Sequence, residues 1–221
     1  MSRAERAARR ADLSGSGPTR RGDGEAPRFP GATSAFGLLG EVLLVGVLVT
    51  LVSLPVVTLP AALAAGVRHL RRYLRAEDSG LDWFWRDVRA GLLGGIGVGV
   101  ASAVLALLLV FDIDLASSGV LPGGPVVGIV GWLGLAALVL VLFTAAGRWT
   151  PQLGWLGAIR SVPRTVRDDP AGAAYLLATA GFAAVVTWQL FPLVIAALGC
   201  IALAIVAVPE RPRRGRGVAS G

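Results

Sequence analysis

Four long apolar segments constrain what this chain can fold into. They cover residues 42–59, 91–111, 125–147 and 171–208. Runs of about 18 or more apolar residues are typical of membrane-spanning helices, because only a helix pairs its own backbone polar groups within hydrocarbon. The last segment is about twice that length and is interrupted only by the sequence TWQ. It therefore predicts two spans joined by a tight turn at Trp188.

The composition agrees with a membrane protein. Charged residues make up 16% of the chain, against roughly 25% in soluble domains. The predicted fold is an all-α, polytopic transmembrane bundle of five to six helices, formed by residues 36–209. Residues 1–35 and 210–221 are rich in Arg and Gly and have few bulky apolar side chains. Such segments bury too little surface to fold, so both are predicted to be disordered cytoplasmic tails.

The arginines between the spans predict the orientation of the chain. Six lie in residues 60–90, none in 112–124, four in 148–170, none at the Trp188 turn and four after residue 210. Basic loops remain in the cytoplasm, so this alternation places the C-terminus there. The N-terminal tail carries seven arginines, which would lie outside the cell if residues 42–59 crossed the membrane only once.

The segment LVSLPVVTLPAALAAGVRHLRRYLR, residues 51–75, leaves two arrangements open. In the first, the chain turns at Pro55 and Pro60, and residues 60–75 return as a membrane helix. Proline lacks an amide donor and suits the first turn of a new helix, so we favour this hairpin, which keeps both termini cytoplasmic. In the second, residues 60–75 form an amphipathic helix at the membrane surface and the N-terminal tail lies outside.

Four arginines of this segment have the spacing of one helix face. They are Arg68, Arg71, Arg72 and Arg75. Arginine side chains near a helix end reach the anionic lipid headgroups, and we expect these four to do so. The net charge of +7 is then explained by contacts between basic residues and the anionic headgroups of the bilayer. The interleaved aromatic and basic residues of a nucleic-acid surface are absent from the sequence, so no nucleic-acid partner is expected.

Small residues recur at every fourth position in the second apolar segment. They are Gly91, Gly95, Gly99 and Ala103. Such a stripe allows another helix to approach closely. The partner is either a helix of the same bundle, which we favour, or another protein or a second copy of the chain.

The polar and aromatic residues near the spans have modest predicted roles. Glu41 precedes the first apolar segment, and we expect it at the lipid headgroups. Five of the six tryptophans lie at segment ends, as in the aromatic belts of membrane proteins. These five are Trp83, Trp85, Trp149, Trp155 and Trp188.

The basic loop at residues 148–170 also has helical spacing. Leu153, Leu156, Ile159 and Val162 recur at helical intervals, and the loop's later arginines lie toward the other side. We expect a helix lying on the inner membrane surface. Permeases use similar cytoplasmic helices to contact their ATPases, which leaves a role in partner binding open.

The residues that enzymes and metal sites require are scarce. The chain has one cysteine, Cys200, and one histidine, His69. The sequence has no phosphate-binding loop ending in Lys-Ser or Lys-Thr, and no carboxylate pair deep within a span. We therefore expect no enzymatic activity, no metal and no cofactor.

Residues 51–92 resemble the signature region of the YesL-like family, small bacterial integral membrane proteins known by a domain of unknown function. The shared features are SLPVVT, a following proline (Pro60, preceded here by Leu59 where the family has Gly), an Ala-rich helix, the basic patch RHLRRYLR, the acidic pair Glu77 and Asp78, and the aromatic stretch WFW. The resemblance implies no assigned catalytic residues. Genes of the family lie near those of carbohydrate-uptake transporters, which implies an accessory role.

We thus expect a multi-pass protein of the bacterial inner membrane that acts as a non-enzymatic accessory or scaffold protein in carbohydrate uptake. Its partners would be anionic lipids and either transporter subunits or a second copy of the chain. The alternative is a small permease for an uncharged solute. A permease requires polar residues along a path, and the candidates are Thr50, Ser53, Ser102, Thr144, Tyr175 and Thr179.

Overall fold

The computed structural model describes residues 30–31, 35–119, 123–190 and 193–210. The two predicted tails therefore lie almost entirely outside the described residues. The chain divides into two compact units, Met1–Pro30 and Gly31–Gly221, and all the helices below belong to the second.

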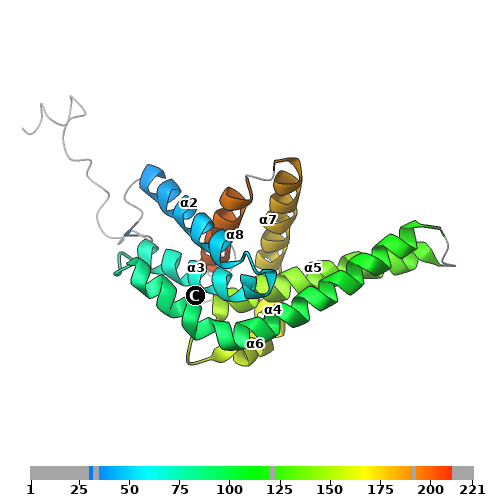
Figure 1. Cartoon of the computed structure of the whole chain (residues 1–221), viewed down its shortest axis with the longest axis horizontal. Coiled ribbons are helices and arrows are strands. Elements are labelled where there is room, and N and C mark those ends of the chain that lie inside the picture. The colour runs from blue at the N-terminus through cyan, green and yellow to red at the C-terminus, as the bar shows by residue number, and fades with distance from the viewer. Residues whose placement is uncertain (1–29, 32–34, 120–122, 191–192, 211–221) are drawn as a thin grey trace, which may run out of the picture. The chain divides into compact units, whose positions relative to one another are not determined.

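The described part of this second unit is all-α, as predicted (Figure 1). Its elements in chain order are α2 (Ala35–Val52), the 3-10 helix η1 (Val56–Thr58), α3 (Leu59–Leu74), α4 (Leu81–Ser117), α5 (Gly124–Arg148), α6 (Gly154–Asp168), α7 (Pro170–Gln189) and α8 (Val194–Glu210). The long apolar segment at residues 171–208 is divided into α7 and α8 beside Trp188, which confirms the predicted turn. The predicted helix in the basic loop is α6.

Three of these helices, α4, α5 and α7, are long and apolar enough to cross a membrane. The apolar helices α2 and α8 are shorter. Many large apolar side chains of α4, α5 and α7 are exposed, including Leu93, Leu107 and Phe182. Extended exposed apolar surfaces of this kind are typical of proteins that contact lipid or partner proteins.

The chain reverses direction between α2 and α3, at the predicted position. Pro55 precedes η1, and Pro60 occupies the first turn of α3. The hydroxyl of Thr58 lies 2.7 Å from the Pro55 carbonyl oxygen and supports the turn. The α2 helix starts seven residues before the predicted apolar segment, which began at residue 42, and it ends at Val52 because the prolines prevent its continuation.

The returning helix α3 forms the centre of the unit. It contacts α2, α4, α5 and α8, and its residues from Pro60 to Val67 are all buried. Half of these residues are alanines, which let the surrounding helices approach closely. Gly66 of α3 faces Val45 and Val49 of α2.

Glycines also bring α2 and α8 together. A Cβ atom at Gly46 of α2 would overlap the backbone carbonyl of Ile195, and one at Gly199 of α8 would overlap the carbonyl of Val42. The two glycines therefore allow direct backbone contact from both sides of this interface.

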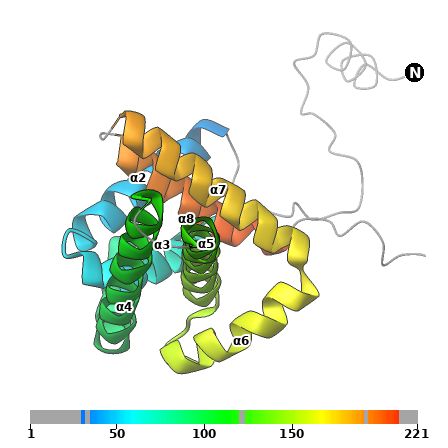
Figure 2. The same ribbon diagram turned by 90° about the vertical axis from the view of Figure 1, so that its right-hand side faces the viewer.

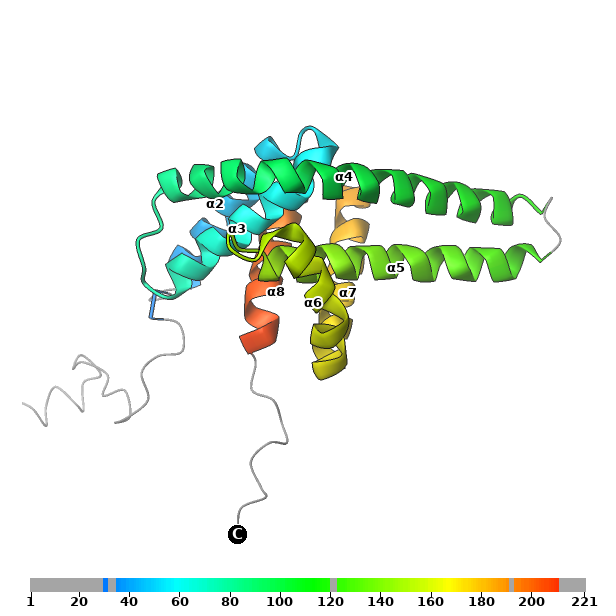
Figure 3. The same cartoon turned by 90° about the horizontal axis from the view of Figure 1, so that it is seen from below.

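The longest helix, α4, has 37 residues, or about 55 Å at 1.5 Å per residue. It extends the predicted span, residues 91–111, at both ends. Its first half packs on α3 and its second half lies beside α5 (Figures 1 and 3). Gly131 and Gly134 of α5 face Ile113 and Leu109 of α4 at this contact. Figure 2 views α4 and α5 nearly end-on, with α7 running across them.

Candidate functional site on the arginine face of α3

The basic half of α3 packs against other helices of the same chain. Its first half is small and apolar, and its second half carries Arg68, Arg71, Arg72 and Arg75 on a strongly amphipathic helix. Only Arg75 is exposed. The structure gives the other three partners within the protein. The expected headgroup contacts of all four arginines stay predictions.

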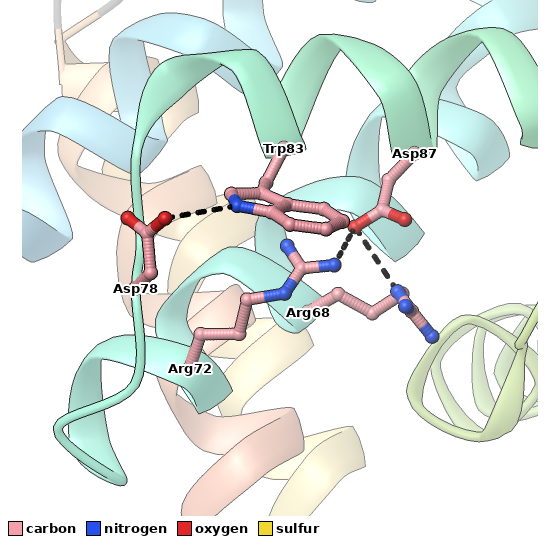
Figure 4. Close-up of polar contacts among 5 residues, drawn as sticks. All are labelled: Arg68, Arg72, Asp78, Trp83 and Asp87. Atoms are coloured by element: carbon pink, nitrogen blue, oxygen red, sulfur yellow. Dashed lines mark hydrogen bonds and ion pairs between the residues drawn. The ribbon is translucent and has the colours of Figure 1, made fainter.

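The centre of this site is the carboxylate of Asp87 on α4 (Figure 4). One oxygen, Oδ2, accepts from the guanidinium of Arg72 at 2.6 Å and lies 3.0 Å from Nε of Arg68. The Asp87 residue is 5% exposed, whereas the arginine side chains are 24% and 14% exposed, for Arg68 and Arg72 respectively. The cluster thus joins α3 to α4 through a buried anion shared by two cations.

Tryptophans flank the two arginines of this cluster. The guanidinium of Arg72 lies 5.3 Å from the ring centroid of Trp83, and that of Arg68 lies 5.9 Å from the ring of Trp149. The indole N–H of Trp83 donates to Asp78 at 3.2 Å (Figure 4). Aromatic faces attract cations, so they partly offset the excess of positive charge over the single carboxylate.

A second buried pair joins α2 to α3. Nε2 of His69 lies 2.6 Å from Oε1 of Glu41, and His69 is 1% exposed. Phe84 of α4 covers the imidazole edge-on, with ring centroids 6.3 Å apart. Glu41 thus has a partner within the protein, and the expectation that it lies at the depth of the lipid headgroups stays a prediction. A carboxylate paired in this way tolerates partial burial.

Arg71 contacts α5, whereas Arg68 and Arg72 bind Asp87 of α4. Its guanidinium donates to the backbone carbonyl of Gly147, near the end of α5, at 3.0 Å. This bond connects α3 to α5 and leaves most of the guanidinium's donors for other partners.

The predicted glycine stripe of α4 is buried within the chain. Gly91 faces Trp149 and Ala61, Gly95 faces Ala61 and Trp155, and Gly99 faces the backbone of Val57 in η1. Ala103 is half-buried. The first three positions therefore serve helix packing in this protein, and a partner protein has no access to them in this arrangement.

Two tryptophans predicted to lie in the aromatic belt belong to the same packed region. Trp149 and Trp155 are 2% and 6% exposed and stack with ring centroids 5.8 Å apart. The indole N–H of Trp155 donates to the carbonyl of Gly91 at 2.9 Å. The belt prediction was wrong for this pair, because the missing side chains of the glycine stripe leave room for both rings. Trp83, Trp85 and Trp188 are exposed, as the prediction requires.

Sequence reasoning missed Asp87, although a signal was present. Asp87 lies four residues before Gly91 and so extends the glycine stripe by one helical turn. An acidic residue that continues a packing stripe, in a chain with a nearby arginine face, predicts a buried ion pair.

The site has the chemistry of a structural cluster. Its two carboxylates are paired, and no three His, Cys, Asp or Glu side chains in the described residues lie close enough to hold a metal ion. Cys200 is exposed on α8. Among the candidate polar residues of a solute path, Thr50, Ser53 and Thr179 donate their hydroxyls to backbone carbonyls three or four residues earlier.

Comparison with known proteins assigns no function to this site. No protein-family model matches the chain, and no curated protein and no solved structure is similar to it.

Proposed function

We propose that this chain is a multi-pass protein of the bacterial inner membrane that acts as a non-enzymatic accessory or scaffold protein for carbohydrate-uptake transporters. Both termini are assigned to the cytoplasm, following the arginine distribution. The assignment to the YesL-like family, and with it the link to carbohydrate uptake, is supported by the motif at residues 51–92.

The observation that carries the non-enzymatic part of the proposal is the pairing of the buried ionisable groups. Asp87 is bound by Arg68 and Arg72, and Glu41 is paired with His69. A catalytic acid or base, or a proton relay, requires a group that exchanges protons with a substrate or a water chain. Groups that tie helices together in this way support a scaffold instead.

The accessory part of the proposal depends on surfaces that remain available to a partner. Helix α6 buries Trp155, Ala158 and Val162 against the protein and exposes Arg160, Arg164 and Arg167. These three arginines recur at helical spacing on its outer side. We assign the partner contact to this face, in place of the glycine stripe of α4, which the protein's own helices fill.

The experiment is a pull-down of the tagged full-length protein from its native membrane in mild detergent, with partners identified by mass spectrometry. We expect transporter subunits in stoichiometric amounts, and their loss when Arg160, Arg164 and Arg167 are all replaced by Gln. The matched control replaces three other exposed arginines, Arg75, Arg86 and Arg89, in the same way. Recovery of this chain alone would contradict the proposal.

The alternative function, a permease for an uncharged solute, has weaker support. A cleft of about 600 Å³ between α5, α7 and α8 is lined mainly by Ala, Val, Leu and Ile side chains. A path for a polar solute requires polar groups along its length. Solute flux into liposomes that contain the purified protein tests this alternative directly.

A further inference from the structure

A second cavity, distinct from the Asp87 cluster, lies where five helices meet. It has a volume of about 210 Å³ and is lined by residues of α3, α5, α6, α7 and α8. Its α5 residues come from the last turns of that helix, its α7 residues from the first turns, and its α8 residues from the last turns. The cavity therefore lies at the end shared by three apolar helices, where a membrane helix meets the headgroup layer.

The lining of the cavity includes two cations and two hydroxyl residues. They are Arg71, Arg148, Thr144 and Thr165, and the hydroxyl of Thr165 donates to the Ser161 carbonyl oxygen at 3.0 Å. Neither arginine forms an ion pair with a carboxylate within the described residues. Arg71 makes one hydrogen bond there, to the Gly147 carbonyl, so most of its five N–H groups have no protein acceptor among the described residues.

The acidic residue of the cavity has a structural role. The carboxylate of Asp169 caps α7 and accepts from the backbone N–H of Gly172 at 2.9 Å. A carboxylate at this position compensates the positive end of the helix dipole. It therefore acts at the α7 terminus. Glu210, at the end of α8, attracts Arg71 electrostatically but forms no ion pair with it, so the guanidinium N–H groups of the two arginines remain available to the oxygens of a ligand.

The lining also includes large apolar side chains, Phe143, Leu176, Ile205 and Val208. A site lined by both guanidinium groups and hydrocarbon fits an amphiphile with an anionic head. The volume is below the roughly 300 Å³ of the smaller drug-sized pockets, so it suits a headgroup and not a complete lipid.

We propose that this cavity binds the phosphate headgroup of an anionic phospholipid, with Arg71 and Arg148 donating to the phosphate oxygens. Guanidinium groups bind phosphate through paired, charge-assisted hydrogen bonds. A soluble phosphate ester could be bound by the same guanidinium groups, but the apolar side chains of the lining favour a ligand that carries acyl chains. This inference stands independently of the accessory function.

The test uses the full-length protein in detergent and native mass spectrometry with added phosphatidylglycerol, phosphatidylcholine or glycerol 3-phosphate. We expect one phosphatidylglycerol to be retained in preference to phosphatidylcholine. Changing either arginine, as Arg71→Gln or Arg148→Gln, should weaken retention about tenfold, because a charged hydrogen-bond donor is lost. The control Arg89→Gln removes an exposed arginine outside the cavity and should leave retention unchanged.

Two results would overturn the proposal. Equal retention by the Arg71→Gln, Arg148→Gln and Arg89→Gln proteins would show that lipid binds elsewhere. Binding of glycerol 3-phosphate without retention of phosphatidylglycerol would assign the site to a soluble ester. If Arg71→Gln fails to fold, Arg148→Gln decides the question, because Arg148 is exposed and its only assigned role is in this cavity.

Discussion

Arg72 of α3 donates to the carboxylate of Asp87 on α4 at 2.6 Å, and this contact fixes the central helix of the protein to its longest one. Asp87 continues the stripe of Gly91, Gly95 and Gly99, so the same face of α4 supplies both the charge and the close approach. Phe84 and Val88 of α4 cluster with Ala65 of α3 beside the ion pair, and the glycines continue the packed face toward the C-terminal half of α4.

The first prediction concerns the loss of this carboxylate. Asp87→Asn leaves the guanidinium groups of Arg68 and Arg72 partly buried without an anion. Removing one partner of a buried pair costs roughly 3 kcal/mol or more, and the partial exposure of Arg68 favours the lower end. Denaturant unfolding in detergent, followed by tryptophan fluorescence, measures the loss. The control Asp82→Asn changes an exposed acid of the same helix and should cost less than about 1 kcal/mol. Equal effects of the two changes would refute a structural role for Asp87.

The second prediction concerns the glycine stripe. Gly99→Ala adds a methyl group that overlaps the backbone carbonyl of Val57, and backbone cannot move aside as a flexible side chain does. We expect a loss of about 1–3 kcal/mol in the free energy of unfolding. Gly97→Ala, two residues earlier, meets no atom within 4 Å and should be neutral or slightly stabilising. A neutral Gly99→Ala protein would mean that η1 does not pack on α4 as described.

The agreement between sequence and structure differs from one element to another. Apolar run length and proline chemistry act locally, so the helices, the reversal at Pro55 and Pro60 and the break beside Trp188 were predictable. The contacts of Arg68, Arg71 and Arg72 were not, because a helical arginine face looks the same whether it meets lipid or a buried carboxylate. The missing information was the position of α4 relative to α3. The sequence indicates this position only when two patterns are considered together: the stripe of α4 that begins at Asp87 and the arginine face of α3.

The third prediction concerns the contact between α2 and α8, which the sequence analysis missed. Gly46→Ala places a methyl group against the carbonyl of Ile195, and we expect the interface to open at a cost of about 1–3 kcal/mol. Gly40→Ala lies on the same helix with no atom within 4 Å and serves as the control. Limited proteolysis distinguishes local opening from global unfolding, because only the former releases an α8 fragment while the rest of the chain stays protected. Identical digestion of both variants would argue against a close contact at Gly46.

The last prediction decides between the two arrangements of residues 51–75. If α2 and α3 form a hairpin that enters the membrane and returns, the N-terminal tail and the C-terminus lie on the same side, in the cytoplasm. A cysteine introduced as Ser14→Cys, with Cys200→Ala to remove the natural thiol, should then resist an impermeant maleimide in intact cells and react after permeabilisation. Ser118→Cys, just after α4 in the segment without arginines, should react in both conditions and controls for reagent access. The arginine rule concerns short loops near the spans, and the long N-terminal tail is the place where it is weakest. Labelling of Ser14→Cys in intact cells would therefore assign seven arginines to the outside, and α3 would then be a helix at the inner membrane surface.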